Sequence, residues 1–488
     1  MSALPSWRAR FAAAALAPLG SMPRGHGLIP GLFALSALLL GCGDLVDVPV
    51  RLTHAPEQEP LLDAAELVFS LEQGGVVLLE QRFGPDPAAL DLGPLSYGTN
   101  FRLRLEIFTS GGHLWSRGRS LPFDVLEGEP APRVDLHLGL TGRFSDAGIA
   151  PPDGRIVGLA ATPEGALVAT AAGSLFTYVH HAPADGRPRL VWLFTDPSLS
   201  GASWIDAGSA RMLAVGGVPP GARLFDADGT LLAERVDGSL GEQATDLVLT
   251  RLSGGALALG GAPAPAMAPS ALVRRIHIDG SEIRIETLPP LPCAVSAAWA
   301  EALTLLVSIR DQDAPRALLP CAEAGASTTF LLVDPLDPSS AVTAQLDGDR
   351  RSAALIPILE GFVAIAGGRD ALGAVSAEVS VLAVSSAALS PTTALNLDPL
   401  STPRAHAAGH ALGGRRALLV GGLDASGAPL ESAELLVVAE RGLVTGHLPA
   451  PAGAPRMIRL LDGTVLVAGE GGFGDYVPTV DPERRVQP

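Results

Sequence analysis

The histidines are the residues of this 488-residue chain whose spacing invites a test for metal chemistry. His180 and His181 are adjacent in the sequence. Because successive side chains of a strand point to opposite faces of a sheet, these two imidazoles would not bind one ion together. His406 and His410 fit no H-E-x-x-H pattern, and histidines placed before a strand usually pack or cap. The sequence therefore predicts no metal site and no cofactor.

The chain also lacks the short motifs that position a nucleophile or a phosphate group. Neither a G-x-S-x-G nucleophile elbow nor a glycine-rich phosphate loop is present. We therefore predict no catalytic residue. The next question is which elements of the fold could present a binding site.

Those elements are short apolar strands that end in small residues and recur about once every fifty residues from residue 155 onward. Glycine at a strand end permits a positive φ and a close approach of neighbouring backbones. We interpret the glycine pairs as architectural features at the end of an inner strand. Four strands end in such a pair: Gly216 and Gly217, Gly260 and Gly261, Gly367 and Gly368, and Gly421 and Gly422. Weaker copies end at Ala171-Ala172, Ser308-Ile309 and Gly469-Glu470.

An arginine and a glutamate recur with the same period. Arg350 and Arg404 each lie seventeen residues before the first glycine of a pair. Glu378 and Glu434 each close a Ser-Ala-Glu segment that follows the pair. A catalytic residue has no reason to recur in successive repeats, so we predict a structural ion pair in each of these two repeats.

The period, the glycine pairs, the arginines and the Ser-Ala-Glu segments resemble kelch repeats. The resemblance implies a kelch-like β-propeller of six or seven blades across residues 155–488, because four-stranded blades must stack to bury both faces. Some kelch propellers, such as galactose oxidase, are copper enzymes that need two tyrosines, two histidines and a cross-linked cysteine. With only Tyr97, Tyr178 and Tyr476 in the chain, we predict no copper site.

An apolar stretch near the N-terminus, LIPGLFALSALLL at residues 28–40, follows Arg24 and precedes Gly41 and Cys42. A basic start, a short apolar core and a small residue before the cleavage point are typical of a secretory signal. The stretch resembles a bacterial lipoprotein signal, which implies that residues 1–41 are removed and that Cys42 becomes an acylated N-terminus. Its acyl chains would anchor the protein to the cell envelope, and we expect the outer membrane. An ordinary signal peptide, and a start at Met22 that gives a signal of usual length, stay open.

The two remaining cysteines, Cys293 and Cys321, form an even pair if Cys42 carries lipid. Both follow Leu-Pro, in LPPLPC and RALLPC. In an exported, oxidising context such a pair predicts a disulfide. Two free buried thiols are the alternative, and two cysteines without a local histidine cluster do not indicate zinc.

Residues 42–142 contain β-rich runs about every ten residues, separated by glycine-rich turns. In FRLRLEIF, the apolar Phe101, Leu103 and Leu105 alternate with charged residues and should share one face. About seven such runs predict a small immunoglobulin-like or fibronectin-like β-sandwich that serves as a spacer. We assign residues 143–154 to a linker.

The net charge of −17 and the pI of about 5.0 disfavour binding to nucleic acid. We expect a non-catalytic binding or display module whose loops contact an unknown protein or glycan. An enzyme with an unrecognised pocket at the propeller mouth, and an envelope assembly scaffold, are the alternatives. A deep pocket with several convergent ionisable groups would favour the enzyme. An exposed tryptophan among Trp192, Trp204 and Trp299 would be a candidate binding anchor, although burial in the core is the default expectation.

Overall fold

The computed structural model describes residues 45–479, except for the segments 55–57, 87–93, 153, 181–187, 242–244, 263–267, 298–302, 310–311, 323–326, 371, 386–387, 396, 414 and 439–442. The regular elements of these residues are strands and two short 3-10 turns, η2 (Pro197–Leu199) and η3 (Pro338–Ser340). In the described part of the chain, no helix has the length and apolar character to cross a membrane. The chain divides into two compact units, and the boundary in the main chain path follows Leu138.

The first unit is built from seven strands that hydrogen bonds join into a single sheet. The strands follow the order β1-β7-β5-β4-β2-β3, β6 pairs with β4, and β1 runs parallel to β7. The division into two sheets that an immunoglobulin-like sandwich requires is therefore not confirmed. The bounds are β1 (Val50–His54), β2 (Glu66–Gln73), β3 (Val76–Phe83), β4 (Gly98–Phe108), β5 (Leu114–Ser120), β6 (Phe123–Val125) and β7 (Val134–Leu140).

Strand β4 is buried on both faces in its middle. Phe101 and Leu105 are buried in the apolar core, as the alternation of FRLRLEIF predicts. Arg104 on the other face is only 1% exposed, and its Nη1 lies 3.1 Å from Oε1 of Glu72. Arg119 Nη2 lies 2.8 Å from Oε2 of the same carboxylate. Two guanidinium groups thus pair with one buried carboxylate, which offsets the cost of removing these charges from water.

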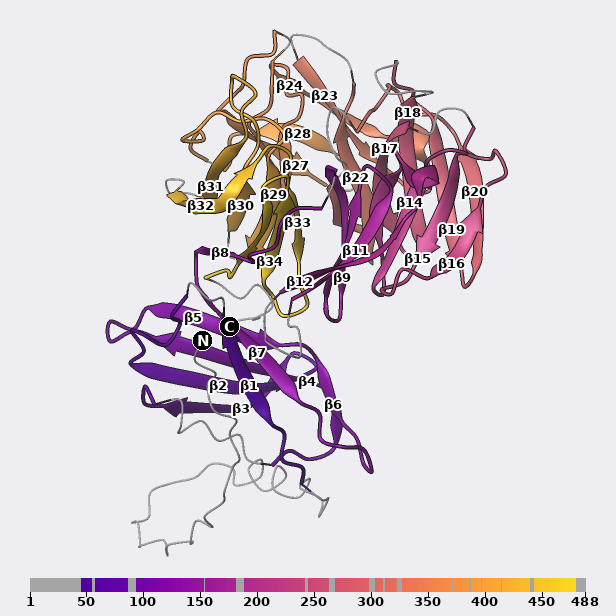
Figure 1. Ribbon diagram of the computed structural model, residues 1–488. Coiled ribbons are helices and arrows are strands. Elements are labelled where there is room, and N and C mark those ends of the chain that lie inside the picture. The colour runs from indigo at the N-terminus through magenta and orange to yellow at the C-terminus, as the bar shows by residue number, and fades with distance from the viewer. Residues whose placement is uncertain are drawn as a thin grey trace, which may run out of the picture. The chain divides into compact units, whose positions relative to one another are not determined.

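The second unit is a seven-bladed β-propeller, each blade a four-stranded antiparallel sheet (Figure 1). The all-β propeller fold is therefore confirmed, with seven blades. Blades one to three consist of β9 (Ile156–Thr162), β10 (Gly165–Thr170), β11 (Ser174–Val179) and β12 (Arg189–Thr195); β13 (Ser203–Gly208), β14 (Arg211–Gly216), β15 (Gly221–Phe225) and β16 (Leu231–Arg235); and β17 (Thr245–Leu252), β18 (Gly255–Ala262), β19 (Val273–Asp279) and β20 (Glu282–Leu288). Blades four to six consist of β21 (Leu303–Ile309), β22 (Gln312–Pro320), β23 (Ser327–Val333) and β24 (Val342–Asp347); β25 (Ala354–Leu359), β26 (Phe362–Ala366), β27 (Val379–Val384) and β28 (Leu389–Thr392); and β29 (Ala408–Gly413), β30 (Arg416–Val420), β31 (Leu430–Val437) and β32 (Leu443–Ala452).

The first strand of each blade lies nearest the axis of the ring, because these strands contact one another from blade to blade. The second strand is sandwiched between neighbouring blades, and β18 is buried at every position. This burial on both faces explains why ALALGG and ALLVGG read as continuous apolar runs without alternation. The glycine pairs lie at the end of this second strand or directly after it, not at the end of the inner strand as the sequence suggests.

The seventh blade closes the ring with strands from two distant parts of the chain. It contains β33 (Arg456–Arg459), β34 (Val465–Gly469), β35 (Gly472–Tyr476) and, as its outer strand, β8 (Phe144–Asp146). Ser145 aligns with Asp475 in the β8–β35 pair. Residues 143–154, which the sequence assigns to a linker, therefore include a propeller strand. The sequence carries little strand signal here, because β8 pairs over three residues only and lies in a segment rich in Ala, Gly and Pro.

In the fourth blade, the repeat predicted from the sequence is aligned with the wrong strand. LTLLVSIR, aligned there with the second strands, forms β21, the inner strand of its blade. The second strand is β22, which ends at Pro320 and is followed by Cys321 instead of a glycine pair. Without the glycines, the sequence offers two apolar runs of similar strength, and the pattern does not distinguish them.

Candidate functional site

A cavity of about 600 Å³ opens near the axis of the propeller, where inner strands begin. Its walls come from the first residues of β9, β13, β17 and β33 and from the loops before them. Inner strands of a propeller run in the same direction, so their first residues meet at one mouth of the channel. The described lining residues include none of the recurring glycine pairs, arginines or glutamates. The charged residues that line the cavity are therefore not among the recurring arginines and glutamates.

Charged side chains line this cavity in two adjoining arcs. Arg155 precedes β9 and Arg456 begins β33, so the cationic arc spans the seventh and first blades. Asp206 in β13 and Asp246 in β17 form an anionic arc on the second and third blades. Asp206 Oδ2 accepts a hydrogen bond of 3.0 Å from Nη1 of Arg251. Burial, and then the charge of Arg155, lower the pKa of Arg456 to about 10, so this guanidinium still carries its charge near neutral pH.

Two histidines of the sixth blade, His406 and His410, are neutral near pH 7. His410 lies in β29, and His406 lies two residues before this strand. Burial, followed by the charges of Arg369 and Arg155, lowers the pKa of His406. Burial and the charge of Arg459 lower the pKa of His410 to about 4. Across the described residues, no group of three or more His, Cys, Asp or Glu is placed to hold a metal ion.

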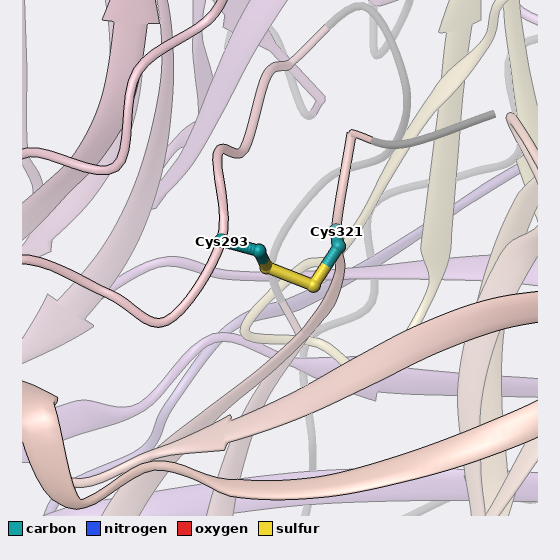
Figure 2. The surroundings of a disulfide bond; sticks show 2 residues. All are labelled: Cys293 and Cys321. Carbon is teal, nitrogen blue, oxygen red and sulfur yellow. A yellow bond between two sulfur atoms is a disulfide. The ribbon is translucent and has the colours of Figure 1, made fainter.

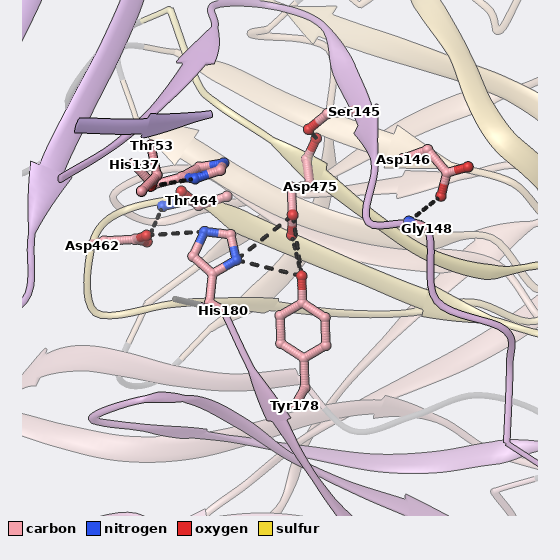
Figure 3. Close-up of polar contacts among 10 residues, drawn as sticks. All are labelled: Thr53, His137, Ser145, Asp146, Gly148, Tyr178, His180, Asp462, Thr464 and Asp475. Carbon is pink, nitrogen blue, oxygen red and sulfur yellow. Dashed lines mark hydrogen bonds and ion pairs between the residues drawn. The ribbon is translucent and has the colours of Figure 1, made fainter. Parts of the chain in front are cut away.

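A second group of ionisable side chains lies where the first blade meets the seventh (Figure 3). Tyr178 in β11 and His180 directly after it belong to the first blade, and Asp475 in β35 and Asp462 before β34 belong to the seventh. His180 Nε2 lies 3.2 Å from Oδ2 of Asp462, and its Nδ1 lies 3.6 Å from Oδ2 of Asp475. The Tyr178 hydroxyl donates to the two carboxylate oxygens of Asp475 at 3.1 and 3.2 Å.

The charges of this Tyr178–His180 cluster stabilise one another. Burial lowers the pKa of His180, but the charges of Asp475 and Asp462 raise it more, to about 9. Burial and the charge of Asp475 raise the pKa of Tyr178 well above its usual value of 10.0. At neutral pH a protonated imidazole therefore lies between two carboxylates. No member of the cluster is more than 7% exposed, so we interpret it as a tie between blades and not as a reaction centre.

Comparisons with known proteins give a fold and no family. No family model and no curated protein matches the sequence. Among solved structures, the chain is similar to a fungal alcohol oxidase of the AA5 family in complex with copper, at 14% identity over 70% of this chain and 76% of that chain, with a TM-score of 0.47. It is similar to YjhT at 9% identity over 67% of this chain and 94% of that one, with a TM-score of 0.37. It is similar to a streptogramin B lyase at 12% identity over 68% of this chain and 96% of that one, with a TM-score of 0.42. These neighbours are β-propellers, and the likeness concerns the fold only.

The structure places Arg404 of the recurring set in a fully buried, hydrogen-bonded site of the sixth blade. Arg404 is 0% exposed, and its Nη2 donates to Oε1 of Glu434 at 2.7 Å and to Oγ of Ser432 at 2.8 Å. Its Nη1 donates to the carbonyl oxygens of Gly421 and Ser432, each at 2.9 Å. Glu434 in turn accepts from the backbone N–H of Ser401 at 2.7 Å. The pair therefore fastens the segment before the blade to its second and third strands.

The equivalent pair in the fifth blade also joins an arginine to the serine and glutamate of a Ser-Ala-Glu segment, but its exposure differs. Arg350 is 3% exposed, forms an ion pair with Glu378, and donates from Nη1 to Oγ of Ser376 at 2.8 Å. Glu378 is 63% exposed at its side chain, whereas Glu434 is 4% exposed. The two pairs thus share a geometry while only one carboxylate is desolvated, which supports an architectural interpretation of both.

The glycine pairs lie where backbone segments approach so closely that a side chain does not fit. All eight glycines have positive φ, from 59° at Gly421 to 107° at Gly216. A Cβ added at Gly367 would lie 2.2 Å from the carbonyl oxygen of Arg404, and one at Gly260 would lie 2.1 Å from that of Val295. Both oxygens belong to the segment that enters the next blade. A side chain at these positions would therefore separate neighbouring blades.

The predicted pair of propeller cysteines forms a disulfide, Cys293–Cys321, with a Cα–Cα distance of 5.8 Å (Figure 2). Cys293 lies between β20 and β21, in the connection that enters the fourth blade. Cys321 follows β22, at the position that a glycine pair occupies in other blades. The fourth blade, one of three without a glycine pair, therefore carries a covalent link at the same place.

The remaining sequence candidates lie in the core, on the surface or outside the described residues. Cys42 and Trp299 lie outside the described residues. Trp204 is 6% exposed and packs in the core, as expected for a propeller tryptophan. Trp192 is 60% exposed on β12, the outer strand of the first blade. Trp192 is therefore the tryptophan that meets the exposure criterion for a binding anchor, although it lies on a strand and not on a loop.

Proposed function

We propose that this protein is an exported, lipid-anchored binding protein of the bacterial cell envelope, with the outer membrane as its location. The proposed anchor is Cys42, because the segment that precedes it resembles a lipoprotein signal. The disulfide Cys293–Cys321 supports an oxidising environment outside the cytoplasm. The propeller serves as a rigid frame that presents a binding surface to a protein or glycan.

One observation carries the binding role: the cavity near the axis is lined by charged residues that do not recur from blade to blade. Arg155, Arg456, Asp206 and Asp246 come from four different strands or strand entries. The repeated residues already have structural partners within their blades, as Arg404 does with Glu434. Charged side chains that converge on one cavity, and that are not part of the recurring ion pairs, are typical of a ligand site.

An enzyme that works in the same cavity is the second candidate, and the convergent ionisable groups favour it. Proton transfer at neutral pH needs a group that changes its protonation state there. Arg456, with a pKa of about 10, keeps its proton. His406, close enough to Arg155 for their charges to interact, is neutral and is the group that could accept a proton. Because the described lining itself contains no histidine or cysteine, we favour binding.

Metabolic labelling with a palmitate analogue tests the anchor. Wild-type protein is expected to incorporate label and to fractionate with membranes, and Cys42→Ala is expected to do neither. Cys321→Ala is the matched control, because it removes a different cysteine and should keep the label. Equal labelling of wild type and Cys42→Ala would refute the anchor.

A pull-down from envelope extract tests the binding role. Full-length wild type and the charge reversal Asp246→Arg are compared, with Asp228→Arg as the control because Asp228 lies in an exposed turn outside the cavity. A partner retained by wild type and Asp228→Arg but lost from Asp246→Arg is expected. If the protein turns over a captured molecule, and His406→Asn abolishes this turnover but not binding, the enzyme is the better assignment. Asparagine is chosen because it tolerates the positive φ of 56° at this position.

A further inference from the structure

Cationic side chains from consecutive blades gather on one side of the cavity. Arg155 and Arg456 line it, and Arg155 is exposed to the solvent there. The positive charges of Arg369 and Arg155 both contribute to lowering the pKa of His406 on the sixth blade. Arg456 is desolvated and the charge of Arg155 lowers its pKa, so the two guanidinium groups repel one another, and an anion bound beside them would offset that repulsion.

The anionic arc of the same cavity is held in a fixed backbone conformation. Asp246 has a φ of 53°, and its carbonyl oxygen accepts the backbone N–H of Ala297 at 3.0 Å. The corresponding contact two blades later joins the N–H of His406 to the carbonyl of Ser352 at 2.8 Å. Each contact ties the entry of one blade to the entry of the next. The backbone that carries the carboxylate of Asp246 is therefore tied to the segment that enters the fourth blade.

We propose that this cavity binds a small ligand whose compact oxyanion, a carboxylate or a phosphate, lies against Arg155 and Arg456 while a hydrogen-bond donor of the ligand faces Asp246. The planar guanidinium group of arginine donates two parallel hydrogen bonds to such oxyanions. The inference deepens the proposed function and rests on it for a ligand in the cavity. Acylation of Cys42 plays no part in it.

The size and the apolar walls of the cavity restrict this ligand further. A volume of about 600 Å³ lies in the range of sites for small molecules. Leu159 and Met457 supply apolar wall, while Trp204 is 6% exposed and offers little ring surface for stacking. The geometry therefore suits a short, charged molecule or the charged end of a larger one, and it disfavours a flat aromatic ligand.

Isothermal titration calorimetry of the full-length protein tests the inference with three probes at constant ionic strength. Inorganic phosphate and succinate carry oxyanions only, and β-alanine carries a carboxylate and an ammonium group. Saturable binding of at least one probe is expected, weakened about tenfold or more in Arg155→Gln, which corresponds to about 1.4 kcal/mol. A preference for phosphate or for the carboxylates identifies which oxyanion the site accepts. Asp246→Asn is expected to weaken β-alanine more than succinate.

Arg284→Gln is the matched control, because it removes the same charge from an exposed ion pair with Glu282 on the outer strand β20. This variant should bind like wild type. Absence of saturable binding for all three probes, or equal affinity in Arg155→Gln and wild type, would overturn the inference. Thermal unfolding of each variant shows that it is folded. If the protein incorporates no palmitate label but binds an anion in the cavity, the proposed lipid anchor is wrong and this inference stands.

Discussion

His180 Nε2 lies 3.2 Å from Oδ2 of Asp462, and this ion pair joins the first blade of the ring to the last. A second tie is the pairing of β8 with β35, in which Ser145 aligns with Asp475. Asp475 belongs to this strand pair, and its side chain also accepts a hydrogen bond from the hydroxyl of Tyr178 in the first blade. Three separate parts of the chain therefore meet where the ring closes.

The charge on His180 should make the protein less stable as the pH rises. The pKa of its imidazole is about 9 in the folded protein, compared with an ordinary value of 6.5 for an exposed histidine. Because the folded value is the higher one, the stabilisation is fully present below about pH 6.5 and is lost as the pH rises through about 9. It amounts to about 3 kcal/mol as an order of magnitude. Urea unfolding of the full-length protein at about pH 6 and about pH 9.5 measures the difference.

His180→Gln should reduce this difference, because a neutral amide replaces the titrating group. The variant should also be less stable at low pH, where the carboxylates of Asp462 and Asp475 lose their cation. His277→Gln is a suitable control, since His277 is 51% exposed on β19. If His180→Gln keeps the full pH dependence of wild type, the imidazole is not its source.

Tyr178→Phe is a milder change in the same cluster. It removes the hydroxyl that donates to Asp475 and keeps the ring, whose centroid lies 5.4 Å from that of Phe473. Loss of a hydrogen bond to a buried charge costs about 1.5–3 kcal/mol. A fall in the urea midpoint with an unchanged slope is expected. A midpoint equal to that of wild type would show that this hydrogen bond adds nothing to ring closure.

The propeller could be predicted because each blade solves the same packing problem with the same residues. Gly367 and Gly421 both have a positive φ and a backbone carbonyl oxygen so close that no Cβ fits, so glycine recurs at a fixed period. The second strand of the fourth blade was not predicted, because Cys321 occupies the position that a glycine pair has in four other blades. Strand β8 was not predicted, because a short outer strand has no recurring residues.

The Tyr178–His180 cluster could not be predicted from spacing. Tyr178 and Asp475 are 297 residues apart in the sequence. Only the closure of the ring brings them together. A weak signal was present, because Asp475 interrupts an otherwise apolar strand near the C-terminus. The cavity could not be predicted from the sequence either. Arg155 and Asp246 lie just before or at the start of inner strands, and the repeat pattern does not indicate that their side chains line one cavity.

Gly367→Ala should destabilise the propeller more than Gly373→Ala in the same blade. Both glycines have positive φ, 69° and 85°, so both substitutions strain the backbone. At Gly367 the new Cβ also meets the carbonyl oxygen of Arg404 at 2.2 Å, whereas at Gly373 no atom lies within 4 Å. We expect the Gly367 variant to lose at least about 2 kcal/mol more. Equal losses in chemical denaturation would show that the blades can move apart freely.

Reduction of the disulfide should lower stability without changing the fold. Cys293 and Cys321 enclose a loop with a sequence separation of 28, for which chain entropy gives about 3–4 kcal/mol. Mass spectrometry under non-reducing conditions should find the linked peptides, and reductant should lower the urea midpoint. The double variant Cys293→Ser/Cys321→Ser should show no response to reductant. A wild-type midpoint that ignores the reductant would contradict this contribution.

The two recurring ion pairs should differ in strength although they share a geometry. Glu434 is 4% exposed and holds Arg404 and the backbone N–H of Ser401, so Glu434→Gln leaves a buried guanidinium without its countercharge. Such a loss costs about 3–5 kcal/mol. Glu378 is 63% exposed, and solvent screens its pair with Arg350, so Glu378→Gln should cost at most about 1 kcal/mol. Urea unfolding of the two variants side by side measures the ratio. Equal costs would show that burial of the carboxylate does not set the strength of the pair.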